Sequence, residues 1–302
     1  MRDACEVAVN GESRMPSSSS STNSASSRGS SVSSIPSQSP SLNSSPSPGG
    51  SPSPGGSTNS SSSPGSPSLS STLSSSFSSS PLLVPTFLGF DVSQYPGDDK
   101  MTAFWDGTGT PFYFTGFYLA PAPNHSDASW MTKRSFLAGL GYGFLVVYVG
   151  RQTTNLTYAQ GQTDGDDAVN KAIQAGFESA VIYLDVESGP PLSQDLLTYI
   201  GGWLDMVGSF AAWHPGVYCS YLTANQIKTS RPNMSIRFWV WRLSNPSPGC
   251  TTEVGSLDPT DSGVAYASSW QYAQNCTNQT WNNQTISPID LDMSTTQNPS
   301  AS

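Results

Sequence analysis

Residues 181–188 (VIYLDVES) form an apolar run that ends in two acidic residues. The β-branched and aromatic residues of this run, uninterrupted by glycine or proline, predict a buried parallel strand. Because side chains alternate along a strand, Asp185 and Glu187 point the same way, roughly 6–7 Å apart at about 3.3 Å per residue. Acids at the carboxyl end of an apolar strand are typical of the active face of a βα barrel.

This pair of acids has two interpretations. Carboxylates at such a separation could divide the proton-donating and charge-stabilising roles of glycoside hydrolysis. They could equally cap the following helix or meet a basic partner, and the spacing alone does not decide between these interpretations.

Strand-like runs recur on both sides of this segment, with helical or loop spacers between them. Residues 130–138, 166–175 and 192–213 predict helices. This alternation predicts an all-parallel sheet, and about eight such strands close into a (β/α)8 TIM-type barrel. The last connections are short or polar, so we expect the barrel to be irregular on that side. The other strand-like runs are residues 87–93, 112–119, 144–150, 217–221, 238–242, 269–272 and 289–292.

Composition divides the chain near Pro81. Residues 1–81 are rich in serine, proline and glycine and contain few apolar side chains, so we expect them to be disordered, as a bare linker or an O-glycosylated stalk. Residues 82–302, about 220 in number, suffice for one barrel domain.

The formal net charge of −9 belongs to the part after Pro81, because acids and bases balance before Ser80. An acidic body without a basic stripe argues against binding to nucleic acid or to an anionic membrane surface. The longest apolar run, residues 136–150, is too short to span a bilayer. The first residues also lack the apolar core of a signal peptide.

We nevertheless expect a secreted or cell-surface protein. Sequons for N-glycosylation would be used only on a eukaryotic export route. After Pro81 they begin at Asn124, Asn155, Asn233, Asn275, Asn278 and Asn283.

The cysteines favour a small number of disulfides over a metal site. Cys250 and Cys276 bracket a polar loop and could close it, whereas Cys219 lies in an apolar run and is expected to be a buried thiol. Without a cluster of histidines and cysteines, we expect neither a metal nor an organic cofactor.

An ordered set of short motifs resembles the signature of family 25 glycoside hydrolases, which are lysozyme-type muramidases that cleave peptidoglycan. Two further segments, TGFYL at 115–119 and VYVGRQ at 147–152 followed by GDDA at 165–168, are similar to the related domain of unknown function 1906. That group is also described as the Rv2525c-like glycoside-hydrolase-like domain. The resemblance covers residues 86–294. The four motifs of the first set are GFDVS at 89–93, YLDVE at 183–187, WQY at 270–272 and IDLD at 289–292.

The resemblance implies a (β/α)8 barrel with Glu187 as general acid and Asp185 as the group that stabilises positive charge on the sugar. Asp91 and Asp290 would line the floor of the site. Gln152 and Gln271 are candidates for hydrogen bonds to the sugar. Aromatic faces for sugar stacking could come from Tyr118, Tyr148, Tyr218, Trp241 and Trp270, although aromatic residues in strands more often form barrel core.

Together with the carboxylate pair, the resemblance implies a retaining glycosidase that acts, as a monomer, on a cell-wall polysaccharide such as peptidoglycan. One alternative is a catalytically inactive glycan-binding barrel on a flexible stalk. Another is a structural surface protein whose serine-rich region is the functional part. Independently of this choice, Arg242 near the end of its strand could pair with one of the acids, which would lower the pKa of that acid and work against a proton-donor role.

Overall fold

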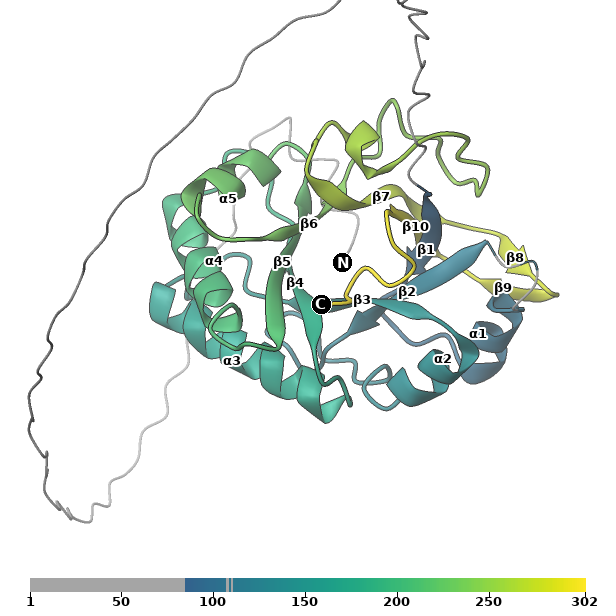
Figure 1. Cartoon of the computed structure of the whole chain (residues 1–302), viewed down its shortest axis with the longest axis horizontal. Coiled ribbons are helices and arrows are strands. Elements are labelled where there is room, and N and C mark those ends of the chain that lie inside the picture. The colour runs from purple at the N-terminus through teal and green to yellow at the C-terminus, as the bar shows by residue number, and fades with distance from the viewer. Residues whose placement is uncertain (1–84, 107–108, 110) are drawn as a thin grey trace, which may run out of the picture. The chain divides into compact units, whose positions relative to one another are not determined.

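Eight strands close into a barrel in the order β1-β10-β7-β6-β5-β4-β3-β2 (Figure 1). The structure is a computed structural model that describes residues 85–106, 109 and 111–302. The barrel strands are β1 (Phe87–Asp91), β2 (Phe112–Tyr118), β3 (Gly143–Val149), β4 (Ala180–Val186), β5 (Trp213–Ser220), β6 (Arg237–Trp241), β7 (Ala267–Cys276) and β10 (Ile289–Ser294). Outside it lie α1 (Asp98–Phe104), α2 (Arg134–Leu140), α3 (Tyr158–Gln174), α4 (Gln194–Val207), α5 (Ala224–Ser230), the 3-10 helix η1 (Pro259–Ser262) and the hairpin of β8 (Gln279–Trp281) and β9 (Gln284–Ile286).

The prediction of a TIM-type barrel is confirmed, but the prediction that all its strands are parallel is wrong for β10. This strand is antiparallel to both of its neighbours, β1 and β7. The polar segment between β7 and β10 forms the β8–β9 hairpin instead of a crossover helix, so the chain returns in the opposite direction. The expected irregularity of this side is confirmed. As a result, Asp290 at the start of β10 pairs with Asp91 at the end of β1.

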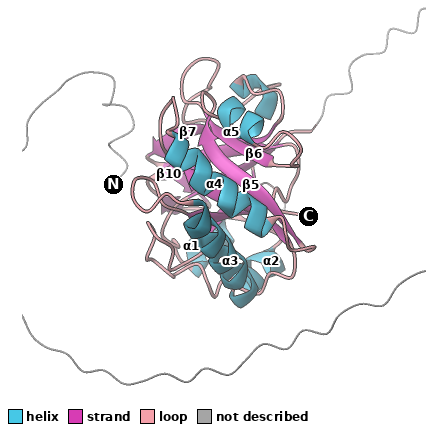
Figure 2. Ribbon diagram, turned by 90° about the vertical axis from the view of Figure 1, so that its left-hand side faces the viewer, coloured by secondary structure: helices cyan, strands magenta, loops and turns pink. Residues whose placement is uncertain are grey.

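The central strand β4 is buried along its whole length, as its apolar sequence predicts. One face lies in the barrel interior, and helices α3 and α4 lie side by side on the outside of the barrel (Figure 2). Helix α3 begins earlier than the expected residue 166, because the Thr157 side chain accepts a hydrogen bond from the backbone N–H of Gln160 and caps it there.

Helices α3 and α4 approach each other at glycine. A Cβ atom added to Gly161 in α3 would lie 2.1 Å from the carbonyl oxygen of Tyr199 in α4. A Cβ atom on Gly202 in α4 would lie 2.1 Å from the carbonyl oxygen of Tyr158 in α3. Each helix therefore needs a residue without a side chain where the other crosses it.

The C-terminal segment covers the barrel end at which the parallel strands begin. The backbone N–H of Val181 donates to the carbonyl oxygen of Ser300 over 2.9 Å, and the N–H of Val146 donates to the Ser300 hydroxyl over 2.9 Å. Inside the barrel, the Tyr183 hydroxyl donates to the carbonyl oxygen of Pro299. These contacts occupy one end, and the opposite end carries the candidate site.

The cysteine predictions are confirmed: Cys250 and Cys276 form a disulfide, and Cys219 is a buried free thiol. Among the described helices, none is long and apolar enough to cross a bilayer. The predicted disordered segment, residues 1–81, lies outside the described part of the chain.

Candidate active site

Three of the predicted acids meet at the barrel end where the parallel strands finish. Asp91 ends β1, Asp185 lies near the end of β4, and Asp290 lies at the start of the antiparallel β10. All three are buried, with 1%, 8% and 2% of their surface exposed, respectively. The sequence therefore predicted correctly that these acids belong to one end of the barrel.

The Tyr218 hydroxyl lies within the electrostatic reach of all three acids. Burial raises the pKa of Tyr218 well above its ordinary value, and the charges of Asp185, Asp91 and Asp290 raise it further. The strand register agrees with this placement, because Asp185 of β4 pairs with Tyr218 of β5, and paired residues share a face. The phenol remains a neutral hydrogen-bonding group among the acids.

Asp91 receives two short hydrogen bonds inside the barrel. The Tyr118 hydroxyl donates to Oδ1 over 2.5 Å, and Nε2 of Gln271 donates to Oδ2 over 2.6 Å. The same Gln271 nitrogen lies 3.5 Å from Oδ2 of Asp290. With two donors, the Asp91 side chain is fixed in position.

The Gln271 amide is itself oriented by its neighbours. Its Oε1 accepts from the Tyr218 hydroxyl over 2.7 Å and from Nε2 of Gln274 over 2.5 Å, which turns Nε2 toward the acids. Residues three apart normally face opposite sides of a strand, but the register between β7 and β10 shifts on either side of Leu291. Gln274 was not among the predicted site residues, because this irregularity has no sequence signal.

Gly116 makes room for Asp91. A Cβ atom at this position in β2 would lie 2.6 Å from the Cβ atom of Asp91 and 3.3 Å from the Tyr118 ring. The glycine within the TGFYL motif therefore permits the close packing of β1 and β2 on which the Tyr118–Asp91 hydrogen bond depends.

The two acids of the central strand have different environments. Asp185 is buried, whereas Glu187 follows the end of β4 and its side chain is exposed. Gln152 bridges the backbone between them: Nε2 donates to the carbonyl oxygen of Asp185 over 2.8 Å, and Oε1 accepts from the N–H of Glu187 over 3.1 Å. The Gln152 amide thus continues the β3–β4 pairing beyond the last strand residues and positions the acidic segment.

The predicted aromatic residues fall into two groups. Tyr118 and Tyr218 contact the acid network, and Trp241, half-buried at the end of β6, pairs with Gln271 in the strand register and so shares its face. The structure does not bring the other two to the cluster. Tyr148 faces the helices, where its hydroxyl donates to Asp167 over 2.8 Å.

Trp270 is fully buried next to Arg242, whose carbonyl oxygen accepts from the indole N–H over 3.0 Å. The Arg242 guanidinium donates to the carbonyl oxygens of Ser262 and Asn245. These contacts place the Arg242 guanidinium in the loop after β6, where its hydrogen bonds are made to backbone oxygens and not to the acids of the site.

A fourth buried acid, Asp292, lies deeper in the barrel than Asp290. Its Oδ1 accepts from the indole N–H of Trp239 over 2.9 Å. Burial raises the pKa of Asp292 well above its ordinary value, and the charge of Asp91 raises it further. In the sequence, Asp292 stands out only as the last residue of the IDLD motif.

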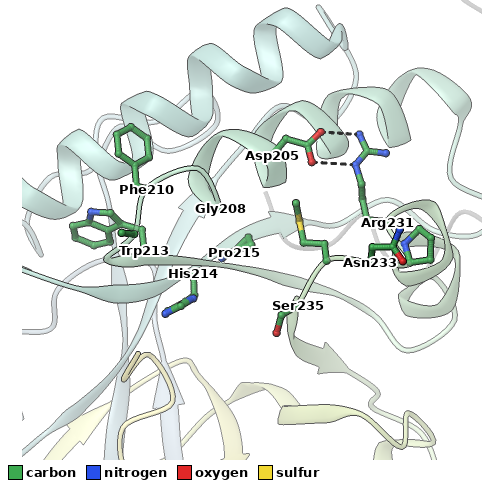
Figure 3. A pocket seen from close by; sticks show the side chains of 12 residues that line it. Asp205, Gly208, Phe210, Trp213, His214, Pro215, Arg231, Asn233 and Ser235 are labelled. Carbon is green, nitrogen blue, oxygen red and sulfur yellow. Dashed lines mark hydrogen bonds and ion pairs between the residues drawn. The ribbon is translucent and has the colours of Figure 1, made fainter. Parts of the chain in front are cut away.

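A pocket of about 560 Å³ lies elsewhere, between the end of α4, the start of β5 and the loop after α5 (Figure 3). Phe210, Trp213 and Pro215 line one part of it, and the Asp205–Arg231 ion pair lies at another. It contains none of the predicted site residues. Among the described residues, no group of histidine, cysteine and acidic side chains could hold a metal ion.

Buried carboxylates at the carboxyl ends of barrel strands are the arrangement that glycoside hydrolase barrels use. Residues 109–296 match the model of the Rv2525c-like, glycoside hydrolase-like domain, and the chain belongs to this family. The family resemblance predicted from the motifs is confirmed. The chain matches none of the curated proteins with which it was compared.

Solved structures show the same fold. An uncharacterised protein of B. stearothermophilus matches with a TM-score of 0.54 and 18% identity, over 69% of this chain and 95% of that one. The Clostridium perfringens spore cortex lytic enzyme SleM matches with a TM-score of 0.50 and 13% identity, over 69% and 67%. A glycosyl hydrolase 25 of Streptococcus pneumoniae gives 0.48 and 11%, over 68% and 86%. At such identities the first two matches establish the fold alone.

Proposed function

We propose that this protein is a retaining glycosidase that cleaves glycosidic bonds of a cell-wall polysaccharide, with peptidoglycan as the first candidate. The observation that carries the proposal is the gathering of buried acids at the barrel end where βα barrels place their active sites: the Gln271 amide contacts Asp91 and Asp290 and accepts from Tyr218, with which Asp185 pairs in the strand register. Family membership supports the same class of chemistry.

In this proposal Glu187 donates a proton to the leaving glycosidic oxygen. Its exposed position at the rim gives a polymer direct access, and a bound sugar would cover it and remove the water that favours its charged form. Asp185, buried two residues earlier on the same face, stabilises positive charge on the sugar or on a cyclised N-acetyl group. Asp91 and Asp290 shape the floor beneath it.

The partner in this account is an extended polysaccharide, bound by a monomer that is secreted or held at the cell surface. The aromatic ring of Trp241, half-buried and on the same strand face as Gln271, is our candidate for stacking against a sugar. We assign no role in the site to Tyr148 or Trp270, because their side chains bond to Asp167 and to the Arg242 carbonyl, respectively.

One observation favours a second function, a catalytically inactive glycan-binding barrel. The Glu187 side chain is exposed in the ligand-free protein, whereas general acids of glycosidases are commonly held in environments that retain the proton. The hydrogen-bonding groups of the floor would serve a bound sugar equally well without turnover.

A panel experiment separates the two functions. The full-length protein is incubated with peptidoglycan, chitin and fungal or algal wall glycans, and both reducing-end release and glycan affinity are measured. Release from one polymer supports the glycosidase and identifies its substrate. Binding without release supports the inactive barrel, and absence of both contradicts the two functions together.

A further inference from the structure

Asp292 is the most completely enclosed acid of the barrel, with none of its surface exposed. In the β1–β10 ladder, Asp91 pairs with Asp290 and Gly89 pairs with Asp292. Asp292 therefore lies on the same face as Asp91 and diagonally below it, with a glycine directly opposite. A carboxyl group in this position underlies the candidate site without reaching its surface.

The hydrogen bonds of the two acids differ. Both oxygens of Asp91 accept a short hydrogen bond, from Tyr118 and from Gln271. Asp292 accepts one at Oδ1, from Trp239, whereas its buried Oδ2 makes no hydrogen bond of ordinary geometry within the described part of the chain. A buried carboxylate with one neutral donor is costly, and a protonated oxygen removes that cost.

The titratable groups around Asp292 all disfavour a second negative charge. Asp91 faces it from β1 and Asp290 lies on its own strand β10, and both raise the pKa of Asp292 beyond the effect of burial. From β7, Tyr272 interacts with it too, and the pKa of Tyr272 is raised by burial and then by Asp292. Of two adjacent acids sharing a proton, the one with fewer donors keeps it.

We propose that Asp292 is a positioning residue of the candidate site, which stays protonated below Asp91 and presents its O–H to the Asp91 carboxylate. The donor comes from Oδ2, so the Asp91 side chain is held from three sides by Tyr118, Gln271 and Asp292. The catalytic consequence rests on the proposed function, but the protonation of Asp292 does not.

The first test measures stability against pH for the full-length wild type and for Asp292→Asn, by chemical denaturation from pH 4 to pH 8. A raised pKa in the folded protein means that the folded state binds one proton more than the unfolded state, above the unfolded pKa of about 3.9. Stability is then lost as pH rises toward the folded pKa, with the unfolding constant rising up to about tenfold per pH unit.

Asparagine keeps the acceptor for Trp239 and replaces the O–H by an N–H that donates to Asp91 without titrating. We therefore expect the wild type to lose stability relative to Asp292→Asn as pH rises, until the folded pKa is reached. Parallel stability curves for the two proteins would overturn the proposal, because Asp292 would then titrate as an ordinary acid.

The second test compares Asp292→Asn with Asp292→Leu, which keeps the volume but can neither accept from Trp239 nor donate to Asp91. Hydrolysis, or glycan affinity if the wild type only binds, should stay within about twofold of wild type for Asn and fall about tenfold or more for Leu. Equal losses in both variants would overturn the proposal, because the charge would then be needed. If the Leu variant does not fold, the pH curves and the Asn variant decide alone.

Discussion

Nε2 of Gln271 lies 2.6 Å from Oδ2 of Asp91, across the strand β10 that separates their strands β7 and β1. The Gln271 amide thereby connects β7 to β1 across the antiparallel strand β10. It also accepts from Tyr218 of β5, so a single side chain links three strands that are far apart in the sequence.

Replacing Gln271 by alanine should destabilise the barrel by about 1–3 kcal/mol, because Asp91 Oδ2 and the Tyr218 hydroxyl lose a buried partner. Chemical denaturation measures this change. Gln174→Ala, an exposed position at the end of α3, is the matched control and should stay within about 0.5 kcal/mol of wild type. Equal stabilities of the two variants would show that the amide network contributes nothing.

Replacing Gln152 by alanine should lower the rate of glycan hydrolysis more than it lowers glycan affinity. The amide holds the backbone at Asp185 and Glu187, so its loss misplaces the proposed acid without removing a group that touches the sugar. Steady-state kinetics would show this as a reduced kcat with little change in KM. Thr153→Ala, at the exposed position next to Gln152, is the control and should leave kcat and KM unchanged. A raised KM with normal kcat would instead make Gln152 a sugar-binding residue.

Replacing Gly161 by alanine should destabilise the protein by about 1–3 kcal/mol or more, because the new methyl group meets the backbone of α4. Gly139 in α2 is the matched control, since a Cβ atom there meets nothing within 4 Å. Gly139→Ala should be neutral or stabilising, by up to about 1 kcal/mol. Similar melting temperatures for the two variants would contradict the close packing of α3 on α4.

Reducing the disulfide should lower stability by about 3 kcal/mol, since it closes a loop between residues 26 apart. Reduction should also loosen Asp290 in the candidate active site, because the N–H of Asn275, next to Cys276, donates to Oδ1 of Asp290 over 2.7 Å. Thermal unfolding with and without reductant checks the first effect. In a double variant with serine at Cys250 and Cys276, reductant should leave the melting temperature unchanged. If reductant lowers the melting temperature of this variant as much as that of the wild type, the loss of stability does not come from the disulfide.

The sequence was most informative where an apolar run ends in an acidic residue. Apolar runs that end in Asp91 and Asp185 predicted both strands and the end of the barrel at which their acids lie. The same reasoning could not find that β10 runs antiparallel to its neighbours, because strand direction depends on the connection. The strands of the β8–β9 hairpin have only three residues each, too few for a clear sequence pattern.

Side-chain direction was the second limit. Tyr148 and Trp270 adjoin residues of the inner face, yet each points to the outside, since neighbours along a strand alternate. Only the register, such as Val149 paired with Asp185, shows which residues of a fully apolar strand face inward. The raised pKa of Asp292 has no sequence signal for a related reason, because it comes from burial and from the charge of Asp91 on another strand.

The central claim is that the acids at the end of β4 hydrolyse a glycosidic bond. Its most direct test is reducing-end release by the full-length protein, compared with Glu187→Gln and with the control Glu178→Gln, an exposed glutamate just before the other end of β4. We predict release by the wild type and the control, and a loss of at least about a hundredfold in Glu187→Gln with glycan affinity retained. Undiminished release by Glu187→Gln, or no release by the folded wild type, would contradict the claim.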